Sequence, residues 1–197
     1  MIEVATPHGP ARYELHEPGG AARALLVLGH GAGGGIGAPD LVAARDAALA
    51  LDVSVALVEQ PYRVAGRKSP APAAQLDVAW LAVLEALARP DPATPLFAGG
   101  RSSGARVACR TAGAAGAAGV LCLAFPLHPP GRPEKTRLPE LEDVAVPVLI
   151  VQGERDPFGM PPAAPDREVV VVPGTHSLRS AGRIGAAVAD WLAARLD

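Results

Sequence analysis

Three polar residues, far apart in the sequence, could together carry out nucleophilic chemistry. Ser102 lies in the pattern Gly100-x-Ser102-x-Gly104, and Asp156 and His176 follow it in that order. A serine hydroxyl is a weak nucleophile, so it needs a base within hydrogen-bonding reach. His176 would take the proton of Ser102 and return it to the leaving group. Asp156 would fix the tautomer of the imidazole and stabilise its protonated form.

The glycines around Ser102 have a physical reason in that chemistry. A G-x-S-x-G pattern places the serine on a strained strand-to-helix turn, where flanking Cβ atoms would clash. The turn also points the backbone N–H of Ser103 at an oxygen that gains negative charge. With 22 glycines among 197 residues, the pattern alone has a real false-positive risk. The chain order serine, acid, histidine adds the context that predicts Ser102, Asp156 and His176 as the catalytic residues.

A second glycine-rich stretch, residues 29–37, follows an apolar run typical of a buried strand. Backbone amides approach a substrate closely only where side chains are absent. We therefore expect the amides of Ala32 and Gly31 to complete an oxyanion hole with that of Ser103; the alternative is a plain flexible turn. His30 is expected to brace this loop and to border the substrate.

Other residues compete for these roles. Glu154 is the rival acid, two residues nearer the preceding strand, whereas Asp143 precedes that strand and lies at its wrong end. Asp156-Pro157 could be an ordinary turn, and His176 could simply start a helix. The remaining histidines lie near the N-terminal strands, in the glycine run or in a proline-rich loop: His8, His16, His30 and His128.

Short apolar runs alternate with helical patterns and would position these residues. We expect strands at residues 2–5, 12–16, 24–28, 53–58, 96–98, 120–125, 146–152 and 168–172. We expect helices at residues 39–51, 73–88, from the serine turn to 111, and 180–196, with loops at 59–72 and 126–140 and a break at 90–95. This alternation predicts one α/β domain over residues 1–197, with a mostly parallel central sheet and helices on both faces. Ligands bind beyond the carboxyl ends of such strands, where the glycine run, Ser102, Asp156 and His176 are expected to lie.

The segment after the strand at 120–125 is too short for a cap. Only residues 126–144 separate it from the next strand, so we predict no cap domain and a shallow, open site. Such a site disfavours long apolar chains and favours small esters, thioesters or the end of a larger substrate. Tyr62 would line the pocket or pack under the loop. Arg63, Arg67 and Lys68 would attract an anionic substrate or form a solvated loop.

Composition excludes several classes of function. A net charge of −2 gives no electrostatic case for nucleic acid or an anionic membrane. Cys109 and Cys122 lie in apolar surroundings without metal-ligand spacing, so we expect buried free thiols and a reducing compartment. No basic region followed by a long apolar run begins the chain, which predicts a cytoplasmic protein. The pattern indicates no metal and no cofactor.

A dinucleotide site is the alternative explanation of the glycine run. Gly29-x-Gly31-x-x-Gly34 follows a strand, and Glu59 ends the next one, where an acid that binds ribose could lie. Against this, Gly35, Gly37 and Pro39 delay the helix that should open at the third glycine.

Six segments of the chain resemble the small, lidless α/β-hydrolase family. They are Leu28-Gly29-His30-Gly31-Ala32-Gly33-Gly34, Pro61-Tyr62-Arg63, Gly99-Gly100-Arg101-Ser102-Ser103-Gly104, Pro126-Leu127-His128-Pro129-Pro130-Gly131, Gln152-Gly153-Glu154-Arg155-Asp156 and Gly174-Thr175-His176. The family includes testis-expressed hydrolase-like proteins, a domain in a subunit of the NSL histone-acetyltransferase complex, and dienelactone-hydrolase-like enzymes. The resemblance spans roughly residues 24–195, and its second and fourth segments are the most particular to this group.

The resemblance implies a serine-hydrolase fold and carries nucleophile, acid and base onto Ser102, Asp156 and His176. It implies no substrate. Ser103 departs from the pattern, because a larger apolar residue or glycine is expected there. We predict a serine hydrolase that cleaves small esters or thioesters through an acyl-enzyme. The alternative is a catalytically silent interaction domain, as in the chromatin-associated relatives.

Overall fold

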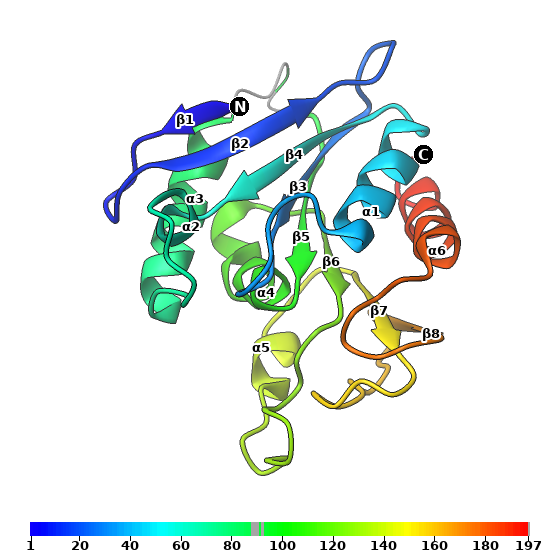
Figure 1. Ribbon diagram of the computed structural model, residues 1–197. Helices are drawn as coiled ribbons and strands as arrows, with labels where there is room; N and C mark the ends of the chain where they lie inside the picture. The colour runs from blue at the N-terminus through cyan, green and yellow to red at the C-terminus, as the bar shows by residue number, and fades with distance from the viewer. Residues whose placement is uncertain (88–90, 92, 197) are drawn as a thin grey trace.

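The computed structural model describes residues 1–87, 91 and 93–196, and within them eight strands form one sheet. Their order is β1-β2-β4-β3-β5-β6-β7-β8 (Figure 1). All neighbours from β4 to β8 pair in parallel, whereas β1 and β2 pair antiparallel with each other and β2 pairs antiparallel with β4. The strands are β1 (Ile2–Val4), β2 (Ala11–His16), β3 (Ala24–Gly29), β4 (Val53–Glu59), β5 (Leu96–Arg101), β6 (Gly119–Leu123), β7 (Val148–Gly153) and β8 (Arg167–Val172).

Helices cover both faces of this sheet, as predicted. On one side, α1 (Pro39–Leu49) and α6 (Ala181–Ala193) lie together; on the other lie α3 (Ala73–Ala86) and α4 (Ser103–Ala115) (Figure 1). Two short helices, α2 (Pro61–Val64) and α5 (Leu138–Glu142), contribute to the core on the α3 and α4 side. No helix in the described ranges is long and apolar enough to cross a membrane.

The core consists of two apolar clusters, one on each face of the sheet. Successive residues of a strand point to opposite faces, so Leu25 and Val27 of β3 join the cluster under α3 and α4, while Leu26 and Leu28 join the cluster under α1 and α6. Because both faces are covered, the central strands read as continuous apolar runs, which is the pattern that predicted them.

Each expected strand and helix within the described residues is present, with shifted ends. The loop expected at 59–72 was wrong in part: Glu59 ends β4, and Pro61 starts α2 because its fixed φ suits the first turn of a helix. Likewise, α5 occupies the end of the loop expected at 126–140. The expected helix end at Ala88 and part of the break at 90–95 fall outside the described residues.

A further correction concerns β5, which continues through both glycines to Arg101 instead of ending at residue 98. Its neighbours lie too close for side chains at these positions. A Cβ atom on Gly99 would lie 2.5 Å from the carbonyl oxygen of Leu121, and one on Gly100 would lie 2.5 Å from that of Gly29. A Cβ atom on Gly104 would collide with the same Gly29 carbonyl. The first turn of α4 therefore rests directly on the end of β3.

Replacing Gly104 with alanine should test this contact. We expect Gly104→Ala to lower the free energy of unfolding by about 1–3 kcal/mol or more, because the backbone of β3 has to move. Gly113→Ala is the matched control on the same helix, since its Cβ would meet no atom within 4 Å. That control should raise the stability by about 0.5–1 kcal/mol, through helix propensity. Urea denaturation of both variants measures the difference, and equal effects would contradict the proposed contact.

Candidate active site

Ser102 lies on the turn between β5 and α4 with an uncommon backbone conformation. Its φ is 52° and its ψ is −106°, and its N–H donates to the carbonyl oxygen of Leu123 at 2.9 Å. A positive φ at a non-glycine residue costs of order 1–3 kcal/mol and persists only where the surrounding structure imposes it. Here the close packing of α4 on β3 imposes it. The turn thus has the strain that the G-x-S-x-G pattern predicts.

A continuous chain of hydrogen bonds joins the three residues singled out in the sequence. The imidazole Nε2 of His176 lies 2.9 Å from Ser102 Oγ, and its Nδ1 lies 2.9 Å from Asp156 Oδ2. Asp156 follows β7 and His176 follows β8, so each comes from the carboxyl end of a parallel strand. A carboxylate that accepts the Nδ1 proton leaves Nε2 free to accept the serine proton. A serine hydroxyl, an imidazole and a buried carboxylate are thus joined in one chain of hydrogen bonds.

Two residues that the sequence analysis did not single out hold this chain in place. Gln152 donates through Nε2 to Asp156 Oδ2 at 2.9 Å, and the N–H of Phe158 donates to Asp156 Oδ1 at 2.9 Å. The Phe158 ring lies against the His176 ring, with centroids 4.2 Å apart. The Asp156 side chain is fully buried. The Asp-x-Phe spacing is a local signal for the Phe158 contact, because aspartate commonly accepts from the N–H two residues on.

The rival residues lie elsewhere. Glu154 is exposed, and its Oε1 is 3.5 Å from Arg155 Nε. His176 precedes α6 by several residues and so does not start that helix. His128 bonds through Nδ1 to the carbonyl oxygen of Pro129. Among the described acids and histidines, Asp156 and His176 are thus the pair that meets Ser102.

The glycine run lies beside Ser102 and is held by two side chains. A Cβ atom on Gly31 would lie 3.6 Å from the Cβ of Ser102. His30 Nε2 accepts the N–H of Gln60 at 3.1 Å, so Nδ1 carries the proton and donates to the carbonyl oxygen of Gly31 at 2.8 Å. Tyr62 donates through its hydroxyl to the carbonyl oxygen of Ala32 at 3.0 Å.

These two bonds fix the direction of the amides in the loop. A peptide unit is planar, so holding the carbonyl of Gly31 also orients the N–H of Ala32 in the same unit. On the other side of Ser102, Ser103 is the first residue of α4, and the first N–H groups of a helix have no acceptor within it. Through these bonds His30 braces the loop, and Tyr62 packs under it.

The hydrogen bonds of His30 require a neutral imidazole, and the burial of the side chain favours that form. His30 is 2% exposed, and burial lowers its pKa, outweighing the opposing effect of its bond to Gly31. Burial likewise raises the pKa of the Tyr62 hydroxyl, which keeps it a donor. Both groups are thus neutral near pH 7 and match the hydrogen bonds they make.

The dinucleotide alternative does not fit the structure. The helix after the glycine run starts only at Pro39, whereas a dinucleotide site needs it to start at Gly34. Its N-terminus, where a pyrophosphate would have to bind, already holds a carboxylate: Asp40 Oδ1 accepts the N–H of Leu41 at 3.0 Å.

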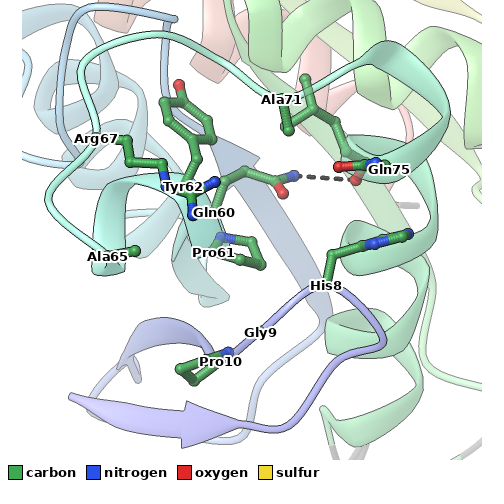
Figure 2. Close-up of a pocket in the computed structure, with 11 residues that line it drawn as sticks. His8, Gly9, Pro10, Gln60, Pro61, Tyr62, Ala65, Arg67, Ala71 and Gln75 are labelled. Atoms are coloured by element: carbon green, nitrogen blue, oxygen red, sulfur yellow. Dashed lines mark hydrogen bonds between the residues drawn. The ribbon is translucent and has the colours of Figure 1, made fainter.

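A cavity of about 210 Å³ lies next to the glycine loop, between the N-terminal turn and helices α2 and α3 (Figure 2). The amide of Gln60 extends into it and donates to the carbonyl oxygen of Leu76 at 3.2 Å. Ser102, Asp156 and His176 do not line this cavity, whereas Tyr62 does. Its lining residues are His8, Gly9, Pro10, Gln60, Pro61, Tyr62, Ala65, Arg67, Ala71, Gln75 and Leu76.

The three cations that follow β4 have different positions. Arg63 is half-buried on α2, and its Nε has no hydrogen-bond partner among the described residues. Its charge is close enough to contribute to lowering the pKa of His30. Arg67 and Lys68 are exposed, and Arg67 lines the cavity.

The buried His30 should make stability depend on pH. Because folding lowers its pKa below the ordinary value of about 6.5, the unfolded chain takes up a proton at higher pH than the native protein does. The contribution of His30 to the free energy of unfolding is therefore fully present above about pH 6.5 and is lost as the pH falls. We expect the stability advantage of the wild type over His30→Asn to shrink between about pH 7.5 and pH 5. Denaturation midpoints of both proteins measure it, and a constant difference would contradict this interpretation.

Comparisons with known proteins agree with this fold. No curated protein matches the chain. Among solved structures, an α/β serine hydrolase without a lid from Xanthomonas campestris superposes with a TM-score of 0.77 at 20% identity, covering 96% of this chain and 93% of that one. A serine hydrolase homologue from Coxiella burnetii gives 0.74 at 19% identity, covering 97% and 96%. Est1E from Butyrivibrio proteoclasticus, with ferulic acid bound, gives 0.80 at 16% identity, covering 100% and 99%.

These structures share the fold of this chain, and a family model extends the match to its sequence. That model, described as an alpha/beta hydrolase domain, matches residues 22–193. With its eight-stranded, mostly parallel sheet and its serine turn, the chain belongs to the alpha/beta hydrolase family.

Proposed function

We propose that this protein is a serine hydrolase that cleaves small esters or thioesters through an acyl-enzyme. The observation that carries the proposal is the unbroken hydrogen-bond chain from Ser102 through His176 to Asp156, on a strained turn in an alpha/beta hydrolase fold. In this proposal Ser102 is the nucleophile, His176 the general base and acid, and Asp156 the residue that orients the imidazole.

The geometry supports the following reaction. Ser102 Oγ attacks the substrate carbonyl carbon while its proton passes to His176 Nε2. The negative charge on the carbonyl oxygen is stabilised by the amides of Ser103 and Ala32, with Gly31 close behind. The carbon–oxygen or carbon–sulfur bond breaks, and His176 protonates the leaving alcohol or thiol. A water molecule then attacks the acyl carbon and gives its proton to His176. The bond between the acyl carbon and Ser102 Oγ breaks, His176 returns the proton to Oγ, and the acid is released.

The surroundings of the site support small substrates. The segment between β6 and β7 contains only the short helix α5, so no cap covers Ser102.

We place the protein with the small, lidless hydrolases that the sequence resembles. Pro61-Tyr62-Arg63, the segment particular to that group, forms α2 and brings Tyr62 to the glycine loop. We also propose a cytoplasmic location, supported by the two cysteines, which are buried and free.

Labelling with a fluorophosphonate tests the proposed nucleophile. We expect one adduct per molecule of wild-type protein by intact mass, and none on Ser102→Ala. His176→Ala should label at least about 10³-fold more slowly, because the serine loses its base. Ser69→Ala, in an exposed loop, is the control and should label as the wild type does. A folded wild type that is never labelled would instead favour the silent interaction domain.

The open site predicts a preference for short acyl groups. We expect kcat/KM for p-nitrophenyl esters to be highest for acetyl or butyryl chains and at least about tenfold lower for long chains, which find no apolar tunnel to bury them. Steady-state kinetics over a series of acyl lengths, with matching thioesters, measure this. Activity that rises steadily with chain length would argue against an uncapped site.

A further inference from the structure

Arg101, the residue before Ser102, contacts two further segments that build the site. Its Nε donates to Asp40 Oδ2 at 2.8 Å, at the N-terminus of α1. Its Nη2 donates to the backbone carbonyl oxygen of His176 at 3.2 Å. One guanidinium thus connects the serine turn, the first turn of α1 and the loop that carries the candidate base.

The same guanidinium lies against the glycine loop. A Cβ atom on Gly31 would lie 2.8 Å from Arg101 Nη1, which is too close for a carbon and a nitrogen that are not bonded. Since the φ of Gly31 is not in the left-handed region, no backbone strain requires a glycine there. The glycine at position 31 therefore makes room for Arg101.

Asp40 is the fixed end of this network. The side chain is 1% exposed, and both of its oxygens are occupied: Oδ1 accepts the N–H of Leu41 and Oδ2 accepts Arg101 Nε. Burial raises the pKa of Asp40, and the charge of Arg101 opposes that rise. A buried carboxylate is tolerated only when it is paired and hydrogen-bonded, so each member of the pair depends on the other.

We infer that Arg101 and Asp40 form a positioning pair that holds the glycine loop and the His176 loop in place relative to Ser102. The inference rests on the proposed function and adds two residues to it. Neither residue touches the reacting atoms: Arg101 acts through the carbonyl of His176 and its close approach to Gly31, and Asp40 acts through Arg101. Arginine suits the task because its planar fork donates in several directions at once, which the single ammonium of lysine does not reproduce.

The labelling rate of Ser102 tests the pair. Fitting the rate against fluorophosphonate concentration separates the maximal rate from the half-saturating concentration, and the end point gives the fraction of competent molecules. For Arg101→Met we expect the maximal rate to fall about 10- to 100-fold, the cost of a misplaced catalytic group. The half-saturating concentration and the labelled fraction should stay within about twofold of the wild type. Arg101→Lys keeps a charge beside Asp40 and serves if the Met variant fails to fold. Its maximal labelling rate should remain several-fold below that of the wild type.

A double variant tests whether the two residues act together. Asp40→Asn keeps the shape but removes the charge, and we expect a smaller loss of rate. Combining Asp40→Asn with Arg101→Met should give the rate of Arg101→Met alone, because residues that act as a unit are not additive. Arg106→Met is the control: it breaks another partly buried ion pair, between Arg106 of α4 and Glu140 of α5, and should label at the wild-type rate.

Each result has a defined meaning. A maximal rate for Arg101→Met and Arg101→Lys equal to that of the wild type would overturn the inference while leaving the proposed function intact. The inference would also be overturned if the rate losses of Asp40→Asn and Arg101→Met multiplied in the double variant. A lower labelled fraction at an unchanged maximal rate would overturn it too, because it indicates a role in folding only. A wild type that is not labelled at all would overturn the proposed function and the positioning pair with it.

Discussion

The contact between the first turn of α4 and the end of β3 is the constraint on which the site depends. Gly100 and Gly104 leave no space between these backbones, and the carbonyl of Gly29 occupies the volume where their Cβ atoms would lie. Because β5 and α4 are held so close together, the residue between them has to turn sharply, and Ser102 takes a positive φ. The strain of that turn is offset by the packing of two buried elements, and not by interactions of Ser102 itself.

The parallel sheet brings several other chemical groups to the turn at Ser102. Strands β3, β5, β7 and β8 all end at the same edge, so the loops that follow them meet there although they are distant in sequence. The glycine loop, Ser102, Asp156 and His176 each follow one of these ends. Hydrogen bonds of 2.9 Å therefore join residues that follow three different strands.

Buried polar groups hold these loops, and each is paired with a group from another segment. His30 accepts from Gln60 and donates to Gly31, Asp40 pairs with Arg101, and Gln152 donates to Asp156. In a low-dielectric interior an unpaired group of this kind is costly. The same bonds that satisfy these groups also fix the direction of the loop amides and of the imidazole, so burial and positioning have one physical cause.

Local patterns determined much of this protein by themselves. Continuous apolar runs predicted the buried strands, helical periodicity predicted α3 and α6, and the glycines around Ser102 predicted its turn, because each signal depends on neighbours within a few residues. The order of Ser102, Asp156 and His176 was also readable, since it requires only that each follows a strand.

Only the tertiary structure decided which of two nearby acids meets the histidine. Glu154 and Asp156 both follow β7, and the bonds of Gln152 and Phe158 to the carboxylate, together with the arrival of the loop after β8, select Asp156. The link from Arg101 to Asp40 and to the carbonyl of His176 was equally invisible, because it joins residues separated by 61 and 75 positions. Such contacts depend on where a side chain points in three dimensions, and no periodicity along the chain records that direction.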